Sequence, residues 1–295
     1  MNIALTGSSG SIGKDLIPFL ENLGHSIISI SSSMPKNGKS IFAYADLVEK
    51  KISFEADVII HLASLNSNLL NEDVDKEVEL TRMILNAMPE MNCSKIIFFS
   101  TAKVYGDNSF VKKIFSESSD LNPSCSYSKA KKICEDLIAL MSSELDLDAT
   151  ILRLPPVLNQ ADHSNLGKLI RLAKSGTYIP TFSSGNTNLR SFISPANIKE
   201  VIQALLKAER HSGNYNIYNL ADDQPIALNN LLRIYGDKKI ITLPILLEKL
   251  VFKIPFLRSI LLKLYGSFII KNDKLKNNLD VKILSTQQAV LLNHP

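Results

Sequence analysis

The segment Thr6–Gly13, which reads Thr-Gly-Ser-Ser-Gly-Ser-Ile-Gly, constrains the fold of this chain more than any other stretch. It follows the apolar run Asn2–Leu5 directly and leads into the helical pattern of Ile12–Leu23. The order strand, glycine-rich turn, helix is typical of a dinucleotide-binding unit. A turn without a ligand is the alternative. The candidate cofactor-binding residues of this segment are Gly7, Ser9, Gly10, Ser11, Ile12 and Gly13.

Each glycine of the segment has its own expected purpose. Gly7 can take the tight turn, and Gly10 lets the backbone approach a pyrophosphate with no Cβ in the way. Gly13 lets the helix pack closely against the strand. The first N–H groups of the helix have no partner within it, and they attract phosphate.

The first half of the chain alternates short apolar runs with helical patterns. Runs of this kind are expected to be parallel strands covered on both faces. They are Ser26–Ile30, Ile41–Tyr44, Asp57–Leu62, Lys95–Ser100 and Ala149–Leu154. The helical patterns are Ile12–Leu23, Val74–Met88 and Ser126–Ser142. The sequence therefore predicts an α/β fold with a Rossmann-like, doubly wound parallel sheet.

After about Pro155 the pattern changes to mostly helical. Helices are expected near Leu166–Lys174, Pro195–Arg210, Leu228–Ile234 and Ile245–Tyr265, with short strands near Phe192 and Tyr215–Asn219. We therefore expect an NAD(P)-binding domain at residues 1–155. Residues 156–295 are expected to form a smaller substrate-binding lobe, interleaved with the last elements of the first domain.

Composition excludes several classes of function. The net charge of +4 is small and scattered, which argues against a nucleic-acid partner. The three cysteines show no metal-ligand spacing, and their odd number suits a reducing compartment, so no metal site is expected. Met1 leads straight into the first apolar run without a signal-type segment. A cytoplasmic protein is expected.

No apolar run reaches the roughly 20 residues that a membrane-spanning helix needs. The closest approach, Ile240–Ile270, is interrupted by charged residues and by Pro255. Burial of this segment in the substrate lobe or in a subunit interface is the expectation. A surface amphipathic helix, and with it peripheral membrane association, is the alternative.

A second chemical signal is the pair Tyr127 and Lys131, one helical turn apart and therefore on one side of a helix. A lysine ammonium beside a phenol favours the phenolate and is expected to lower its pKa from about 10. The pair can then exchange a proton with an alcohol or ketone. Ser100 and Thr101 add two hydroxyls at the end of a strand, where a parallel sheet opens to ligands.

Three motifs together resemble the extended short-chain dehydrogenase/reductases, the NAD-dependent epimerase/dehydratase family. They are Thr-Gly-x-x-Gly-x-x-Gly at Thr6–Gly13, Ser-Thr-x-x-Val-Tyr-Gly at Ser100–Gly106 and Tyr-x-x-x-Lys at Tyr127–Lys131. The resemblance covers nearly the whole chain and implies an NAD(P)-dependent enzyme acting on a nucleotide sugar.

The resemblance assigns roles to the catalytic candidates. It implies that Tyr127 passes the proton and that Lys131 holds the nicotinamide ribose and polarises Tyr127. Thr101 falls on the position of the family's catalytic Ser/Thr, which orients the substrate oxygen, and its neighbour Ser100 is a candidate substrate contact. Hydride would move between the sugar carbon and the nicotinamide, which is chemistry that the cofactor supplies.

Further cofactor contacts follow from the resemblance. Asp46 and Leu47 resemble the family's pair at the adenine, with a helix N-cap as the alternative for Asp46. Leu62 and Ala63 resemble the loop beneath the pyrophosphate and nicotinamide ribose, whereas the preceding His61 is expected to be a packed strand-end histidine. Pro155 falls where the family's backbone meets the nicotinamide.

Two substrate contacts also follow from the resemblance. Ser164–Leu169 resembles the family's Asn-Leu segment at a helix start, which implies that Asn165 contacts the diphosphate of a nucleotide sugar. Arg190–Asn197 resembles the family segment whose arginine grips this diphosphate, a contact that suits a planar bidentate donor. The alternative for Arg190 is a solvated loop charge.

The chain departs from the family pattern at three places. Ser31 stands near the position where NAD enzymes carry an acidic residue for the adenosine ribose; with Lys36 nearby, this favours NADP modestly. Glu77 replaces an asparagine and suggests a local change in packing. Pro155-Pro156 follows Arg153-Leu154 where sugar-nucleotide 4-epimerases often have Tyr-Phe-Asn after the arginine, and it is more similar to reductases of 4-keto sugar nucleotides.

The sequence therefore predicts NAD(P)-dependent hydride transfer at C4 of a UDP-sugar. Reduction of a 4-keto sugar in surface polysaccharide synthesis is favoured, with 4-epimerisation as the alternative. A third hypothesis is a dinucleotide-sensing protein without catalysis, although such relatives typically lose the tyrosine or lysine that this chain keeps. A homodimer is expected.

Overall fold

The structure is a computed structural model that describes residues 1–31, 41–49, 51–65, 69–158, 165–211, 213–236 and 240–292. The chain forms two compact units and passes between them several times. The first unit comprises Met1–Val104, Leu121–Arg153 and Lys207–Tyr218. The second comprises Tyr105–Asp120, Leu154–Leu206 and Asn219–Pro295.

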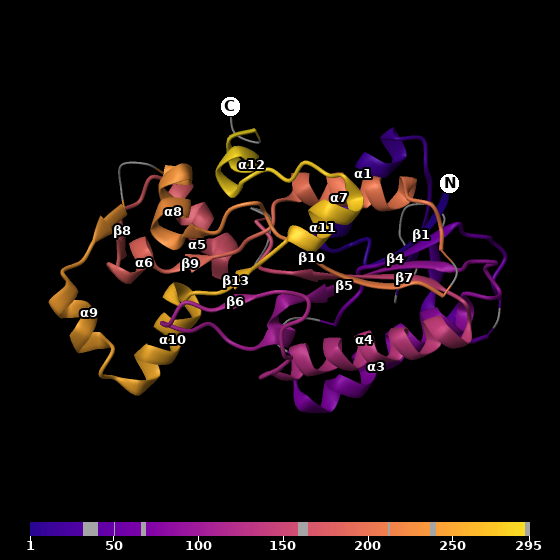
Figure 1. Ribbon diagram of the computed structural model, residues 1–295, viewed down its shortest axis with the longest axis horizontal. Coiled ribbons are helices and arrows are strands. Elements are labelled where there is room, and N and C mark those ends of the chain that lie inside the picture. Colours follow the sequence, from indigo (N-terminus) through magenta and orange to yellow (C-terminus); the bar gives the residue numbers. More distant parts are fainter. Residues whose placement is uncertain are drawn as a thin grey trace. The chain divides into compact units, whose positions relative to one another are not determined.

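The first unit is built on a seven-stranded sheet in the order β10-β7-β5-β4-β1-β2-β3, counting the strands of the described residues (Figure 1). The strands are β1 (Asn2–Thr6), β2 (Ser26–Ser31), β3 (Ile41–Ala43), β4 (Val58–His61), β5 (Lys95–Thr101), β7 (Asp148–Leu154) and β10 (Tyr215–Asn219). Strand β1 pairs in parallel with β2 on one side and with β4 on the other. The chain therefore reverses its winding direction between β1 and β4, and ligands of doubly wound sheets bind at the carboxyl edge of such a point.

Helices cover both faces of this sheet (Figure 1). Helices α3 (Val74–Ala87) and α4 (Ser126–Glu144) pack against each other on one face, with the short α2 (Tyr44–Val48) beside α3. Their apolar side chains, such as Ile84 and Ile138, join a fully buried core with Ile59 and Phe98 of the strands. Helix α1 (Ser11–Asn22) buries Leu16 and Leu20 on the opposite face. This arrangement confirms the Rossmann-like fold that the alternating pattern predicts.

The second unit is mostly helical. Its helices are α5 (Asn165–Lys174), α6 (Ser184–Thr187), α7 (Pro195–Lys207), α8 (Leu228–Gly236), α9 (Ile245–Val251), α10 (Pro255–Tyr265), α11 (Asp273–Leu279) and α12 (Thr286–Leu292). Three two-stranded sheets join β6 (Ile114–Phe115) with β13 (Ile269–Ile270), β8 (Ile179–Thr181) with β12 (Ile240–Thr242), and β9 (Leu189–Arg190) with β11 (Ile226–Ala227). A buried carboxylate, Asp222, accepts hydrogen bonds from Ser194, Asn197 and Thr286 and ties α7 to the start of α12.

Two expectations for the second half need correction. The segment Ile245–Tyr265 forms two helices rather than one, because Pro255 lacks the N–H of a helix interior and instead begins α10. The strand expected near Phe192 lies slightly earlier, at Leu189–Arg190. The strand Tyr215–Asn219 forms as predicted, but it is an edge strand of the seven-stranded sheet.

No helix in the described part of the chain is long and apolar enough to cross a membrane. In these same residues, no cluster of three or more histidine, cysteine or acidic side chains has the arrangement of a metal site. Cys93, Cys125 and Cys134 are free thiols.

Candidate active site

The glycine loop between β1 and α1 is tightly built around its glycines. Gly7 has a φ of +72°, and a Cβ there would lie 2.8 Å from the backbone nitrogen of Ala63. A Cβ on Gly13 would lie 2.5 Å from the carbonyl oxygen of Gly7. At Gly10 the nearest atom to a Cβ is that same oxygen, at 3.2 Å. Gly7 and Gly13 are thus required by the chain's own packing, while a Cβ on the exposed Gly10 would meet only the Gly7 oxygen.

Gly10 is also the N-cap of α1, and it has no side chain to cap the helix. Its own N–H donates to the carbonyl of Gly7 at 3.0 Å, which closes the turn. The N-terminus of α1 therefore has no side-chain cap from its N-cap residue. A helix N-terminus that binds an anion requires such an uncapped start. Ser9 precedes this N-cap and Ser11 and Ile12 begin α1, and their contacts with phosphate stay predictions.

The loop after β4 lies against the glycine loop. The backbone N–H of Ala63 donates to the Thr6 hydroxyl at 3.0 Å, and the carbonyl carbon of Leu62 would lie 2.9 Å from a Cβ on Gly7. Leu62 and Ala63 are both partly buried. The structure therefore brings these two predicted cofactor contacts beside Gly7, at the point where the sheet reverses.

Helix α4 carries Tyr127 in its first turn and Lys131 one turn later. The side chain of Lys131 is fully buried, although Tyr127 is only partly so. The Nζ of Lys131 lies 3.1 Å from Oε1 of Glu77 and 4.7 Å from the centre of the Phe98 ring. The charge of Lys131 is therefore compensated by a buried carboxylate on α3.

The pKa of Tyr127 differs from the expectation. Burial raises it above the ordinary value of 10.0, and the nearby charge of Lys131 offsets this only in part. The lowered pKa expected from the lysine is therefore wrong, because desolvation of the phenolate outweighs the attraction. Tyr127 holds its proton at neutral pH and is poised as a donor.

Lys131 keeps its own charge. Burial lowers its pKa, but attraction to Tyr127 and Glu77 outweighs burial, and the net pKa lies above 10.5. Glu77 also accepts a hydrogen bond from the backbone of Leu65 at 2.7 Å, so its carboxylate joins α4 to the loop after β4.

The sequence analysis noted Glu77 only as a change in packing. The available signal was an acidic side chain on the face of α3 that turns toward α4.

Thr101 is the last residue of β5. The Thr101 hydroxyl accepts a hydrogen bond from the backbone N–H of Lys103 at 3.3 Å, and Lys103 Nζ lies 5.9 Å from the centre of the Tyr127 ring. Thr101 thus stays in place where β5 leads into the short 3-10 turn η2 (Ala102–Tyr105).

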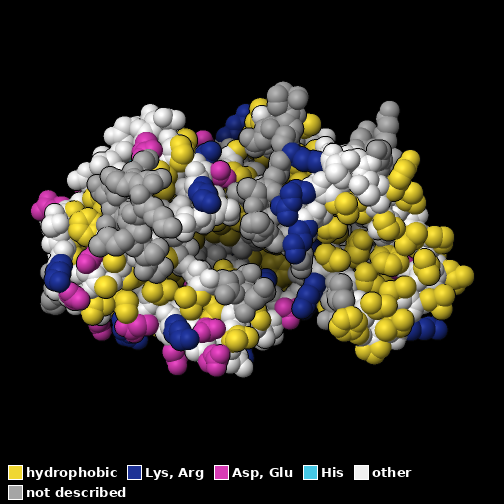
Figure 2. Space-filling view, turned by 180° about the vertical axis from the view of Figure 1, so that it is seen from behind, with side chains coloured by type: hydrophobic (Ala, Val, Ile, Leu, Met, Phe, Trp, Pro, Cys, Tyr) yellow, Lys and Arg dark blue, Asp and Glu magenta, His cyan; other side chains and the backbone are white. Residues whose placement is uncertain are grey.

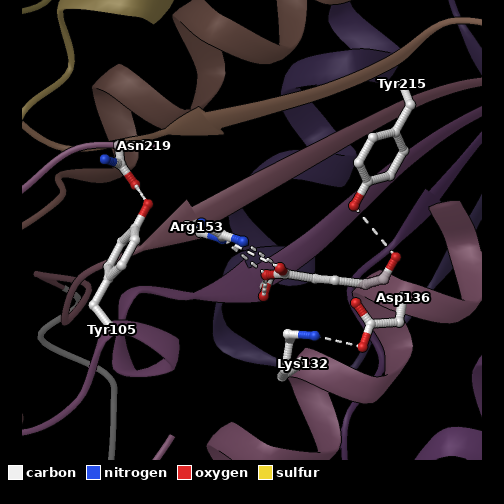
Figure 3. A network of polar contacts seen from close by, with 8 residues as sticks. Tyr105, Lys132, Asp136, Arg153, Tyr215 and Asn219 are labelled. Atoms are coloured by element: carbon white, nitrogen blue, oxygen red, sulfur yellow. Dashed lines mark hydrogen bonds and ion pairs between the residues drawn. The ribbon is translucent and has the colours of Figure 1, made fainter. Parts of the chain in front are cut away.

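Ser100 is turned to a different partner. Its hydroxyl donates to Glu135 of α4, which also receives the Arg153 guanidinium, with 2.6 Å between Nη2 and Oε2 (Figure 3). Tyr215 of β10 points at this turn of α4 and donates its hydroxyl hydrogen to the Glu135 carbonyl at 3.3 Å (Figure 3). The single hydroxyl hydrogen of Ser100 is therefore donated to Glu135. The expected contact of Ser100 with substrate stays a prediction.

A chain of buried hydrogen bonds runs beneath the site. Thr6 Oγ1 lies 2.6 Å from His61 Nδ1, and His61 Nε2 lies 3.2 Å from the hydroxyl of Thr81. Thr81 in turn donates to the Cys134 sulfur at 3.3 Å. Burial lowers the pKa of His61 to about 3, so the ring is neutral. This agrees with the interpretation of His61 as a packed histidine rather than a base.

The predicted adenine contacts take part in local structure. Asp46 Oδ2 accepts a hydrogen bond from the backbone N–H of Ala43 at 2.8 Å, which stabilises the start of α2, and Leu47 is buried in the core. The N-cap alternative for Asp46 needs correction, because Ala43 is the N-cap of α2 and Asp46 bonds to it from the third helical position. The adenine contact stays a prediction. Ser31 is the last residue of β2 and is partly buried, whereas Lys36 lies outside the described residues.

The remaining predicted residues belong to the second unit. Pro155 is buried directly after β7, and Asn165 begins α5, although its side chain and Ser164 lie outside the described residues. Arg190 Nη1 donates to the carbonyls of Lys263 and Leu264 at the end of α10, at 2.9 and 3.0 Å. Burial lowers the pKa of Arg190 to about 10. Arg190 is thus an anchor for the last turn of α10 rather than a solvated loop charge.

Comparison with known proteins gives a consistent result. The family model described as "NAD dependent epimerase/dehydratase family" matches residues 3–221. A protein named "Putative UDP-arabinose 4-epimerase 4" from Arabidopsis thaliana is 26% identical over 264 residues, covering 73% of this chain and 60% of its own length, which is less than two thirds. A protein from Escherichia coli O157:H7, named "N-acetyl-alpha-D-glucosaminyl-diphospho-ditrans,octacis-undecaprenol 4-epimerase", is 24% identical, covering 78% of this chain and 70% of its own length.

Among solved structures, a UDP-N-acetylglucosamine 4-epimerase from Bacillus cereus has the same fold. It superposes with a TM-score of 0.78 at 19% identity and covers 100% of both chains. At this identity the likeness concerns the fold.

Proposed function

The chain belongs to the NAD-dependent epimerase/dehydratase family of enzymes, and on this premise we propose that it transfers hydride at C4 of a nucleotide sugar with bound NAD(H). The observation that carries the proposal is the set of groups at the carboxyl edge of one sheet. The glycine loop, Thr101 and the Tyr127–Lys131 pair all belong to the first unit. A nicotinamide cofactor supplies the hydride acceptor and donor for such a reaction.

The residues present fit this cofactor. The exposed Gly10, which has no side chain, and the uncapped start of α1 suit a pyrophosphate, and Leu62 and Ala63 border the same loop. Lys131 is the ammonium that would hold the nicotinamide ribose. Its charge persists because Glu77 compensates it.

Tyr127 would move the proton. Its phenol is protonated at neutral pH, so it donates a proton to a C4 ketone oxygen, and the phenolate that forms is stabilised by Lys131. In the opposite direction the phenolate accepts the C4 hydroxyl proton. Thr101 would orient the same oxygen by a hydrogen bond from its hydroxyl.

Within this reaction class we place 4-epimerisation first, because the relatives described above are named 4-epimerases. Reduction of a 4-keto sugar is the second candidate, supported by Ser31 and by the Pro155-Pro156 step. An epimerase must keep its cofactor and show no net redox change. A reductase must consume NADH or NADPH in proportion to substrate.

The test separates these reactions in one experiment. The protein is incubated with UDP-glucose, UDP-N-acetylglucosamine and their 4-keto-6-deoxy derivatives, while the absorbance of NADH and NADPH is followed separately and the sugars are analysed. Interconversion of sugars without cofactor consumption identifies an epimerase. Cofactor binding with no change in any sugar would contradict catalysis on these substrates and favour the sensing hypothesis.

The Tyr127→Phe variant tests the assignment of the proton carrier. It keeps the ring and removes the transferable proton, so the rate is expected to fall about 10²–10⁴-fold. NADH affinity, measured by titration calorimetry, is expected to stay close to wild type. A rate near that of the wild type would contradict the role of Tyr127.

The homodimer and the cytoplasmic location also stay predictions. Light scattering after size-exclusion chromatography measures the oligomeric state directly.

A further inference from the structure

The second unit exposes an apolar surface along α9, α10 and the strand before them, which we call the α9–α10 face. Its members are large hydrophobic side chains with most or about half of their surface in solvent, namely Ile241, Ile245, Leu246, Leu247, Leu250, Ile254 and Phe256. Leu246 is 69% exposed and Phe256 is 73% exposed. Hydrophobic side chains gather on the right of Figure 2, where α9 and α10 lie. Burial in the substrate lobe, one part of the expectation for this segment, is therefore wrong for α9 and the start of α10, and burial in a subunit interface stays a prediction.

Helix α9 is oriented opposite to an ordinary surface helix. Its acidic residue, Glu248, is buried and accepts hydrogen bonds from the Ser183 hydroxyl and, at 3.3 Å, from the backbone N–H of Ser184. This carboxylate attaches α9 to the start of α6. A surface helix normally turns its charges outward and its aliphatic residues inward. The fold here holds the aliphatic residues of α9 toward the solvent, which indicates a partner surface.

The charges beside the face have one sign. Glu248 is the one acidic residue between Ile240 and Tyr265, and it points inward. The exposed charged side chains in this stretch are all basic, namely Lys249, Lys253, Arg258 and Lys263. An apolar face whose own segment carries only basic exposed charges complements a surface that is apolar within and anionic at its edge.

We propose that the α9–α10 face docks on an anionic lipid bilayer. The aliphatic residues and Phe256 would enter the boundary between headgroups and acyl chains, and the basic side chains would lie against lipid phosphates. A second copy of the chain fits this face less well. A two-fold interface would set the same basic residues against each other, and like charges across an interface are unfavourable.

The test uses the absence of tryptophan from the chain. Phe256→Trp in the full-length protein places one indole on the face, and Leu292→Trp places one at a control site of similar exposure, since Leu292 is 69% exposed on α12. Each variant is titrated with phosphatidylcholine vesicles, with and without phosphatidylglycerol. The emission of Phe256→Trp is expected to shift to the blue with the anionic vesicles, and that of Leu292→Trp to stay unchanged. Raised salt is expected to weaken the binding.

Flotation with the same vesicles measures the contribution of each part of the face. Leu246→Ser combined with Phe256→Ser is expected to reduce bound protein at least about tenfold, as is Lys249→Glu combined with Lys253→Glu, whereas Leu292→Ser is expected to bind as wild type. Thermal unfolding and light scattering of each variant check that the fold and the oligomeric state are retained.

The proposal does not depend on the reaction at the active site. Tyr127→Phe is expected to bind vesicles as tightly as wild type, so a failure of the proposed chemistry leaves this result standing. Absence of binding to anionic vesicles would overturn the proposal, as would binding that the two double variants do not weaken. Dissociation of a dimer by the Leu246 and Phe256 changes, without vesicle binding by the wild type, would instead identify a second copy as the occupant.

Discussion

A buried lysine keeps its charge only where a partner compensates it, and Glu77 does so for Lys131. Both side chains are almost fully buried, and the carboxylate also holds the backbone of Leu65. Removal of one partner of a buried ion pair leaves an uncompensated charge. A single side chain on α3 therefore sets the position and the electrostatics of a predicted catalytic residue on α4.

Glu77→Gln is expected to destabilise the protein by about 3–5 kcal/mol, because Lys131 would stay buried without its counter-charge. The matched control is Lys132→Gln, which removes the exposed pair with Asp136 and is expected to cost about 0–1 kcal/mol (Figure 3). Urea unfolding measures both. Equal costs for the two variants would mean that the buried pair contributes no more than a surface pair.

Thr101→Val removes a hydroxyl while keeping the shape of the side chain. We expect it to lower the rate, and Thr101→Ala to lower it by a similar factor, because Ser100 donates its hydrogen to Glu135 and does not stand in. Thr101→Ser should recover most of the activity. Steady-state kinetics of the three variants decide this. Near-normal turnover of Thr101→Ala would mean that Ser100 leaves Glu135 and replaces the lost hydroxyl.

At the scale of elements, the glycines in the turn from β1 into α1 have two different roles. Gly7 and Gly13 are needed for packing within the fold, whereas Gly10 is expected to be needed for ligand binding. Gly13→Ala is expected to destabilise the protein, because its Cβ would lie 2.5 Å from the Gly7 carbonyl oxygen, which also accepts a hydrogen bond from Gly10. Gly10→Ala meets the same oxygen at 3.2 Å and is expected to leave the unfolding temperature nearly unchanged while weakening NADH binding. Thermal unfolding and calorimetric titration distinguish the two. Unchanged NADH affinity in Gly10→Ala would make the loop a turn without a ligand.

The hydrogen bonds that join β1, β4 and α3 through His61 make stability depend on pH. The folded pKa of about 3 lies below the ordinary value of 6.5, so between these values the unfolded chain binds a proton that the folded protein excludes. The free energy of unfolding should therefore be greatest above pH 6.5 and fall with acidification, by up to about 1.4 kcal/mol per pH unit from this group.

The test compares wild type with His61→Asn by urea unfolding between pH 4 and pH 7. The variant removes the titrating group, so its stability should fall less steeply with acid than that of the wild type. His211→Asn changes an exposed histidine and serves as the control. Equal slopes for wild type and His61→Asn would mean that His61 takes up a proton in the folded state.

The elements show what sequence reasoning captures. Period and turn chemistry predict β1, α1 and the buried parallel strands closely, because each depends on neighbours along the chain. The partner of Lys131 and the anchoring of Arg190 on the carbonyls of α10 depend on residues distant in sequence. The outward aliphatic face of α9 was anticipated only as the alternative of a surface amphipathic helix, for the same reason. A hydrophobic run predicts burial, and only the attachment of Glu248 to α6 reverses its orientation.

At the scale of the whole molecule, the chain leaves the first unit before it is complete and returns later. Lys207–Tyr218 belongs to the first unit although it lies between two segments of the second, Leu154–Leu206 and Asn219–Pro295. Within it, β10 lies beside β7, the backbone of Ala208 accepts a hydrogen bond from Lys95 at 3.1 Å, and Tyr215 donates to the Glu135 carbonyl. The sequence contains the signal for β10 and predicts that late elements return to the first domain, but it does not place this strand beside β7.

A fragment of residues 1–155 is therefore expected to lack a stable fold. It would expose the edge of β7, leave Lys95 without the Ala208 carbonyl, and open a row of unpaired backbone groups that invites aggregation. Circular dichroism during heating should give a broad, non-cooperative transition, whereas the full-length chain should unfold cooperatively. Addition of residues 207–219 to the fragment through a flexible linker is expected to restore a sharper transition, because β10 can then pair with β7. A fragment of residues 1–155 that unfolds cooperatively and stays monomeric would show that the sheet is stable without β10.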